Sequence, residues 1–229
     1  MAKTAVKRKP AIDPPPSGLV IHDVDQGSDE WFQARLGVVT ASNFATVMAD
    51  GKDGGPSLTR TKLLHKLAGE QMTGEPAEET FRSIAMDRGR SLEDEARTSY
   101  CKRKNVEPRR VGFGTNFNGL KFCGASPDSL LGFDGGLEIK TARADILIPM
   151  LKLPARMPPE HRCQVQGNML VFERDWWDLT IYCHRSMPAM DVRIYRDDAF
   201  IKQLSEQIER FNWELNNLVA SLKKMGAAG

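Results

Sequence analysis

A carboxylate and an amine occur two positions apart in one short stretch of the sequence. In GLEIK, residues 136–140, the alternation of a β-strand places Glu138 and Lys140 on one face and two apolar side chains on the other. Asp128, in a Ser-Pro-Asp turn, comes ten positions before Glu138. Turn signals divide this region into short strands, so we expect the two carboxylates to lie on adjacent strands.

Carboxylate and carbonyl oxygens are the ligands that hard divalent cations such as Mg²⁺ prefer. Asp128 and Glu138 could supply two carboxylates, and the main-chain carbonyl of Ile139 a third oxygen. Lys140 would point into the same cleft, where a lysine beside a bound metal can orient or help deprotonate the attacking water and stabilise charge on a phosphodiester. The pattern therefore predicts a metal-dependent site that cleaves phosphodiesters. These residues alone are equally compatible with an ion pair on an exposed strand, worth less than about 1 kcal/mol.

The segments around this stretch predict a domain of mixed α and β structure. The expected elements, in order, are two short helices starting near Ser28 and Thr40, helices at 58–72 and 86–105, an antiparallel meander of short strands at 109–140, a helix at 159–173, and strands at 178–184 and 191–195. Glu93 lies on the helix that precedes the meander. An apolar stripe from Ile201 to Leu222 predicts a long C-terminal helix that packs on the same domain.

Composition indicates a soluble globular protein. Of the 229 residues, 41% are hydrophobic and 27% charged, and no apolar run approaches the 18 residues of a membrane-spanning helix. We expect one domain over residues 19–229. It is preceded by a basic, proline-rich tail at 1–18 with the composition of an extended or disordered segment. The N-terminus lacks the apolar core of a signal peptide, so we expect a cytoplasmic protein without a membrane partner.

Cysteine spacing and net charge limit the possible partners. The four cysteines lie far apart, with no Cys-x-x-Cys pair, so they are interpreted as reduced thiols rather than as a zinc site or a disulfide framework. A formal charge of only +2 means that a polyanion would have to be held by local clusters, for which Lys102–Lys104 and Arg109–Arg110 are candidates.

Several stretches in register resemble the phage lambda exonuclease family of alkaline exonucleases, the YqaJ-type viral recombinases of the PD-(D/E)xK nuclease superfamily. They are VDQGSDEWFQARLGVVTAS at 24–42, GRSLEDEAR at 89–97, GASPDSLL at 124–131, GLEIK at 136–140 and QVQGNM at 164–169. The combination is far more specific than any one motif, and it spans about residues 24 to 210. The resemblance implies a restriction-endonuclease-like α+β fold with an α/β-type core, in which helices flank a mixed β-sheet.

The resemblance also implies roles for particular residues. Asp128, Glu138 and the carbonyl of Ile139 match the metal ligands, with Mg²⁺ as the cofactor and Mn²⁺ as a substitute. Lys140 matches the residue that acts on the nucleophilic water. Glu93 matches an accessory acid that positions water at the metal, and Gln164 a glutamine that orients the active site. Glu93 could equally belong to an exposed helix face.

A second set of residues resembles the family's pocket for a terminal 5′ phosphate. Arg35, Ser42 and Ser126 would supply a guanidinium fork and two hydroxyl donors, which suit a dianionic end better than an internal phosphate. The match fades between Met48 and Arg60. Arg60 is a candidate for strand contact and Met86 for a strand-separating wedge.

The function implied by the resemblance is a metal-dependent exonuclease that degrades one strand of linear double-stranded DNA from its 5′ end. It leaves a 3′ single-stranded overhang for recombination, with a single-strand annealing protein as a possible partner and a processive homotrimeric ring as the assembly. Two alternatives stay open: an endonuclease of restriction or repair type with the same fold, and a DNA-end-binding module without turnover.

Overall fold

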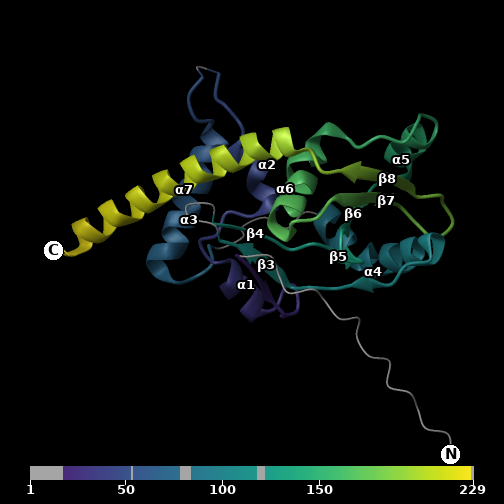
Figure 1. The fold of residues 1–229 in the computed structure, drawn as a ribbon, viewed down its shortest axis with the longest axis horizontal. Coiled ribbons are helices and arrows are strands. Elements are labelled where there is room, and N and C mark those ends of the chain that lie inside the picture. The colour runs from purple at the N-terminus through teal and green to yellow at the C-terminus, as the bar shows by residue number, and fades with distance from the viewer. Residues whose placement is uncertain (1–17, 53, 78–83, 118–121, 228–229) are drawn as a thin grey trace, which may run out of the picture.

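The computed structural model describes residues 18–52, 54–77, 84–117 and 122–227, and of residues 84–90 it describes the main chain. The expected tail therefore lies outside the described residues, apart from Gly18, and so does the side chain of Met86. The chain folds into two β-sheets with helices packed against them (Figure 1).

The larger sheet carries the motif that opened the sequence. Its five strands run in the order β2-β5-β6-β7-β8, formed by Pro108–Arg109, Ser129–Leu131, Gly135–Thr141, Trp176–Tyr182 and Met190–Tyr195. The β5–β6 and β7–β8 pairs are antiparallel, whereas β6 and β7 are parallel. The sheet is therefore mixed, as the resemblance implies, and its central strand β6 contains both Glu138 and Lys140.

The smaller sheet holds the segment that leads into the Ser-Pro-Asp turn. It has the order β1-β3-β4, from Leu19–His22, Phe113–Asn116 and Cys123–Ala125, with both pairs antiparallel. A parallel bridge between Thr40 and Gly124, beside a 3.0 Å hydrogen bond from the Gly124 N–H to the Val39 carbonyl, ties the chain after the first helix to β4.

The helices are assigned in chain order. They are α1 (Asp29–Arg35), α2 (Phe44–Val47), α3 (Leu58–Thr73), α4 (Ile84–Lys104), α5 (Ala144–Leu151), α6 (Arg162–Phe172) and α7 (Asp198–Ala227), with 3₁₀ turns η1 (Ala41–Asn43) and η2 (Pro159–His161). Ser28 caps α1 through a hydrogen bond from the Trp31 N–H, as its sequence position predicts.

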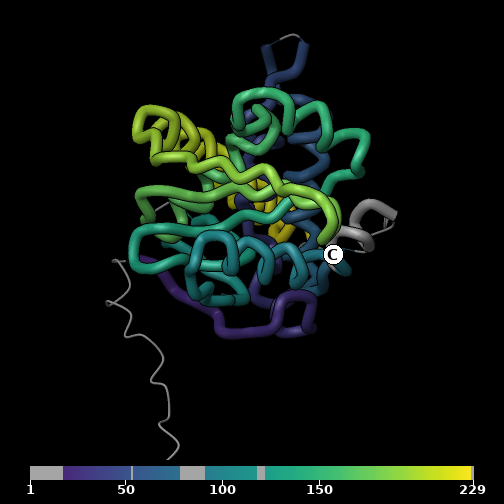
Figure 2. Tube along the Cα trace, turned by 90° about the vertical axis from the view of Figure 1, so that its right-hand side faces the viewer, coloured from purple at the N-terminus to yellow at the C-terminus, as the bar shows by residue number. Residues whose placement is uncertain are grey.

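Different helices cover the two faces of the larger sheet. Leu137 and Ile139 pack with Ala96 and Tyr100 of α4, whereas Glu138 is turned toward α6, where it contacts Asn168. Strand alternation thus separates the apolar and charged side chains of β6 as predicted. The turned view shows the strands as a layer with α4, in teal, along one side (Figure 2).

Helix α7 packs on the domain through its apolar stripe, which confirms that expectation. Ile201, Leu204, Ile208, Phe211 and Leu215 are buried, while the C-terminal end of the helix extends beyond the body of the molecule (Figure 1).

Arg60 belongs to this helix contact. It is only 4% exposed, and its Nη1 donates to Glu214 Oε2 of α7 at 2.7 Å. This ion pair joins α3 to α7, and contact of Arg60 with a DNA strand stays a prediction.

The strands expected as one antiparallel meander belong to two different sheets in the structure. The consecutive pairs β3–β4 and β5–β6 form, but β4 and β5 belong to different sheets because the Ser-Pro-Asp turn redirects the chain between them. Strand β1 and helix α5 were not expected. Strand β1 follows directly on the proline-rich tail, and α5 contains Pro149, which disfavours a helix in sequence-based reasoning.

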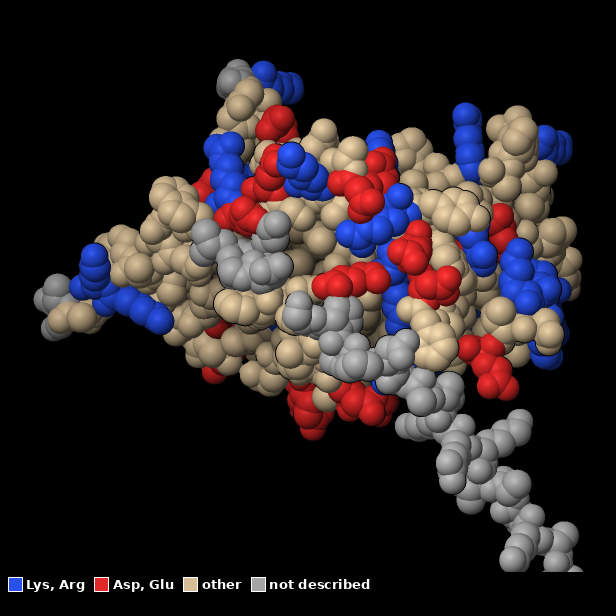
Figure 3. Space-filling model, viewed as in Figure 1, with Lys and Arg blue, Asp and Glu red and all other residues tan. Residues whose placement is uncertain are grey.

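Charges of both signs alternate over the face seen in Figure 3, rather than forming one continuous basic field. The expected basic clusters are partly neutralised. Arg103 and Lys104 both pair with Asp191, at 2.9 and 3.3 Å, and Arg110 lies 3.3 Å from Asp94.

Within the described residues, no helix combines the length and the apolar character needed to cross a membrane.

Candidate active site

Glu138 is a buried carboxylate held by three side chains. It is 2% exposed. Its Oε1 accepts hydrogen bonds from Lys140 Nζ at 2.6 Å and from Gln164 Nε2 at 2.7 Å, and its Oε2 accepts one from Asn168 Nδ2 at 3.0 Å. A buried charge is tolerated only when it is paired and hydrogen-bonded, and Glu138 meets both conditions. Its position is therefore fixed by two elements, β6 and α6.

Asp128 lies directly before β5, beside β6. Its Oδ2 accepts a hydrogen bond from the Ile139 N–H, so the carboxylate sits against the main chain of β6. Burial raises the pKa of Asp128 well above its ordinary value, and the charges of Glu138 and Glu93 raise it further. The structure thus gathers three of the sequence-predicted carboxylates closely enough for their charges to interact.

Lys140 and Gln164 complete this cluster. Lys140 Nζ donates to Gln164 Oε1 at 3.0 Å as well as to Glu138, so the amide of Gln164 bridges the lysine and the carboxylate. Burial by itself lowers the pKa of Lys140, but the nearby carboxylates, Glu138 foremost, raise it above its ordinary value. Lys140 is therefore held as an ammonium that faces the acidic cluster.

Glu93 approaches the cluster from α4. Its side chain is 30% exposed and forms an ion pair with Arg97, four residues further along the helix. Its charge raises the pKa of both Asp128 and Lys140, so it lies on the side of α4 that faces these residues. Glu93 is consequently not part of a merely solvated helix face.

The donor set suits a hard divalent cation. Asp128 and Glu138 bring two carboxylates together with their charges in conflict, and a cation between carboxylates relieves such repulsion. Within the described ranges, no three His, Cys, Asp or Glu side chains form a ready metal cluster, so main-chain oxygen or water would have to complete the ligands. The residues therefore fit an ion such as Mg²⁺, which keeps several waters.

A second cluster lies on the same turn, two residues before Asp128. Ser126 Oγ accepts hydrogen bonds from Arg35 Nη1 and from Trp31 Nε1, each at 2.9 Å. The Arg35 guanidinium also lies over the Trp31 ring, 4.1 Å from its centre. A hydroxyl accepts hydrogen bonds through two lone pairs, and these two donors use both. The Ser126 O–H therefore points away from them and can donate a hydrogen bond to an anion.

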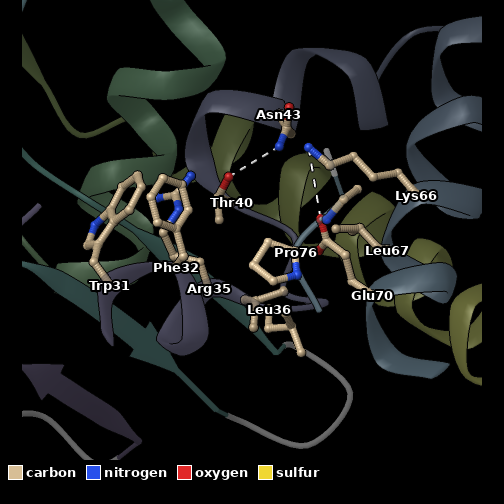
Figure 4. A pocket seen from close by; sticks show the side chains of 12 residues that line it. Trp31, Phe32, Arg35, Leu36, Thr40, Asn43, Lys66, Leu67, Glu70 and Pro76 are labelled. Carbon is tan, nitrogen blue, oxygen red and sulfur yellow. Dashed lines mark hydrogen bonds and ion pairs between the residues drawn. The ribbon is translucent and has the colours of Figure 1, made fainter. Parts of the chain in front are cut away.

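Ser42 lies in η1, which follows the segment bridged to β4. Thr40, two residues before Ser42, forms a parallel bridge with Gly124, two residues before Ser126. Ser42 is exposed, and its Oγ lies 3.0 Å from Thr40 Oγ1. Arg35 and Thr40 line a pocket whose far wall is formed by Lys66 and Glu70 of α3 (Figure 4).

A model of the YqaJ-like viral recombinase domain matches residues 30–175, which is more than half of the chain. The chain belongs to the YqaJ-like viral recombinase family. This confirms the resemblance seen in the sequence. Among curated proteins, none matches the chain.

Solved structures agree with this family. The crystal structure of an alkaline exonuclease from Laribacter hongkongensis is 32% identical in sequence and has a TM-score of 0.77, with 88% of this chain and 99% of that chain covered. The same figures hold for that enzyme in complex with dAMP. A phage-related exonuclease from Haemophilus somnus 129PT covers 81% of this chain and 96% of its own at a TM-score of 0.61. At 14% identity it shows the fold alone.

Sequence reasoning missed several residues of this YqaJ-like site. Asn168 and Arg97 each lie four positions after a predicted residue, Gln164 and Glu93, which is one helical turn and places each pair on one face. That spacing could have identified both. Lys66, which faces Arg35 across the pocket, carries no such signal, because only the fold brings α3 beside α1.

Proposed function

We propose that the protein is a divalent-metal-dependent exonuclease that digests one strand of linear duplex DNA from its 5′ end and leaves a 3′ single-stranded overhang. Family membership supports a DNA exonuclease. The observation that carries the proposal is the buried network of Glu138, Lys140 and Gln164 beside Asp128, because it combines metal-binding oxygens with a fixed ammonium.

Each residue has a defined part in this proposal. Asp128, Glu138 and the Ile139 carbonyl would hold Mg²⁺ or Mn²⁺, and the bound ion would polarise the scissile phosphate. Lys140 donates a hydrogen bond to the phosphate or to the attacking water, and Gln164 keeps the lysine in place. Glu93 accepts a hydrogen bond from water on the side of α4.

The short distance between the Ser126 cluster and the Asp128 cluster supports cleavage near the end of a DNA strand. Ser126 and Asp128 are separated by Pro127 alone, so at most about 7 Å of main chain lies between them. A 5′ phosphate held by Arg35, Ser42 and Ser126 would place the first phosphodiester beside Asp128. An endonuclease has no need of a terminal-phosphate pocket at this distance.

Digestion of labelled linear duplex tests the function. With Mg²⁺, we expect label at the 5′ end to be released first, closed circular duplex to stay intact, and chelator to stop release. Lys140→Ala should bind duplex yet lose at least about 10²-fold in rate, the usual value of an acid–base group. Lys202→Ala, an exposed lysine on α7, is the matched control and should keep full activity.

Each of the other outcomes would contradict one part of the proposed function. Cleavage of closed circles at the same rate would identify an endonuclease. Tight binding of ends without any release would identify a DNA-end-binding module. Earlier release of a 3′ label would reverse the proposed direction, and undiminished release in excess chelator would remove the metal.

A further inference from the structure

Arg97 is a buried cation beside the candidate active site that no step of the proposed chemistry uses. It lies on α4 and is only 6% exposed. Its guanidinium forms ion pairs with Glu93 and with Asp94, and its Nε donates a hydrogen bond to Ser129 Oγ at 3.1 Å. A buried guanidinium is costly unless all sides are satisfied, so this arrangement needs a reason beyond a surface ion pair.

The two carboxylate partners of Arg97 differ in their surroundings. Asp94 has a side chain that is 77% exposed and is shared with Arg110 at 3.3 Å. Glu93 is the less exposed of the two, and it lies on the side of the helix that faces Asp128. The contact of Arg97 with Glu93 is therefore the one that bears on the site, and it restrains a side chain that could otherwise turn into solvent.

Ser129 extends this contact to the main chain of the metal-binding turn. Its side chain is fully buried, and its Oγ donates a hydrogen bond to the main-chain carbonyl of Asp128. Arg97 thus joins Glu93 on α4 to the first residue of β5, directly after Asp128. The guanidinium has a planar, forked set of donors, so it can hold a carboxylate and a hydroxyl at once in one geometry.

We propose that Arg97 is a positioning residue that holds the Glu93 carboxylate toward Asp128 and anchors α4 to the start of β5. This inference rests on the proposed function, because it assigns Glu93 a part in the site. The proposal assigns Arg97 no direct contact with the DNA or the metal. It acts through Glu93, so its effect should vanish when Glu93 can no longer act.

A double-mutant cycle separates positioning from a general effect on folding. Arg97→Met should lower kcat on linear duplex by about 10- to 100-fold with little change in KM, the usual effect of losing a partner that orients a metal-site group. In a Glu93→Gln background the same substitution should change kcat less than about twofold, because coupled residues are not additive. Arg97→Lys should recover part of the rate, since an ammonium can pair with Glu93 without also holding Ser129.

Arg193→Met, on β8, is the matched control, because it removes an ion pair whose carboxylate contacts α4. Arg193 binds the buried Asp178 at 2.8 and 2.9 Å, and Asp178 also accepts a hydrogen bond from Tyr100 of α4. This variant should lower Tm without lowering kcat in the folded fraction. Equal losses of kcat from Arg97→Met in the presence and absence of Glu93 would overturn the proposal.

Two further measurements keep the inference testable on its own. If Arg97→Met does not fold, Ser129→Ala removes the anchor with almost no change in volume, and it should show the same dependence on Glu93. Calorimetric binding of Mn²⁺ needs no turnover, and Arg97→Met should weaken it about tenfold. A wild-type protein without nuclease activity would defeat the proposed function, while unchanged Mn²⁺ binding in Arg97→Met would defeat the role of Arg97.

Discussion

At the scale of single residues, Ser126 accepts hydrogen bonds from two side chains and could donate one to an anion. Trp31 and Arg35 both donate to its oxygen, so the hydroxyl hydrogen is oriented by the protein rather than by a ligand. Such preorganisation lowers the entropy lost when an anion binds. Arg35 is held by the same contact and by the Trp31 ring, so the guanidinium is ready for a phosphate before DNA arrives.

This arrangement predicts a preference for phosphorylated ends. Duplex with a 5′ phosphate should be digested faster than duplex with a 5′ hydroxyl, and Arg35→Ala should bring the two rates together, because charge-assisted contacts to phosphate are lost. Single-turnover rates on both substrates measure the ratio. Arg143→Ala, an exposed arginine paired only with nearby Asp145 among the described residues, is the control and should keep the preference. Equal wild-type rates on the two ends would show that the pocket is misassigned.

Residue types and spacing predicted much of the site, but not its supports. Strand alternation was sufficient to place Glu138 and Lys140 on one face, since a period of two admits no other arrangement. Asn168 was missed although it lies one helical turn after Gln164, because an amide on a helix has many possible partners. The partner became evident only when α6 was seen to face β6.

At the scale of elements, α6 supports both clusters. One face holds Glu138 through Gln164 and Asn168. Another packs on η1 and α2, the segment that includes Ser42, and the close approach occurs at Gly167. A Cβ added there would lie 2.3 Å from Cδ2 of the buried Phe44. The glycine therefore sets the separation between α6 and the segment that bears Ser42.

Gly167→Ala should push these elements apart. We expect a loss of about 1–3 kcal/mol from overpacking, only partly offset by the roughly 1 kcal/mol gain in helix propensity. For a chain of this size, that corresponds to a fall in Tm of a few degrees, and kcat should fall with it. Gly69→Ala on α3 is the control: a Cβ there meets nothing within 4 Å, so Tm should rise slightly. A Gly167→Ala protein as stable and active as the wild type would show that Phe44 yields without cost.

The order of elements was predictable where local signals dominate, and their partners were not. The long period of α7 and the cap of α1 were read correctly because they depend on neighbouring residues. The division of the meander into two sheets depends instead on contacts between distant segments, such as the antiparallel pairing of β1 with β3. No pattern within either strand encodes that choice, because strand alternation does not specify a neighbour.

At the scale of the whole molecule, weak net charge limits how DNA can be held. The formal charge is +2, and charges of both signs alternate over the face seen in Figure 3. Affinity that depends on phosphate contacts falls steeply with salt, so scattered basic side chains give a modest hold. Prolonged digestion of one duplex would therefore benefit from enclosing the DNA, which favours the homotrimeric ring that the family resemblance implies.

The part of the α7 stripe from Ile201 to Leu215 is buried in the domain to which the helix belongs, so it is not available to a ring contact. A closed trimer would need two different surfaces in head-to-tail contact. We expect sedimentation to give three chains per particle, and a digestion begun before excess unlabelled duplex is added should continue for many nucleotides. Adding the unlabelled duplex first is the control and should suppress release of label. A monomer at working concentration, or a digestion that stops when the competitor is added, would contradict the ring and leave a distributive nuclease. Without enclosure, a weakly bound enzyme dissociates from its duplex and is captured by the competitor.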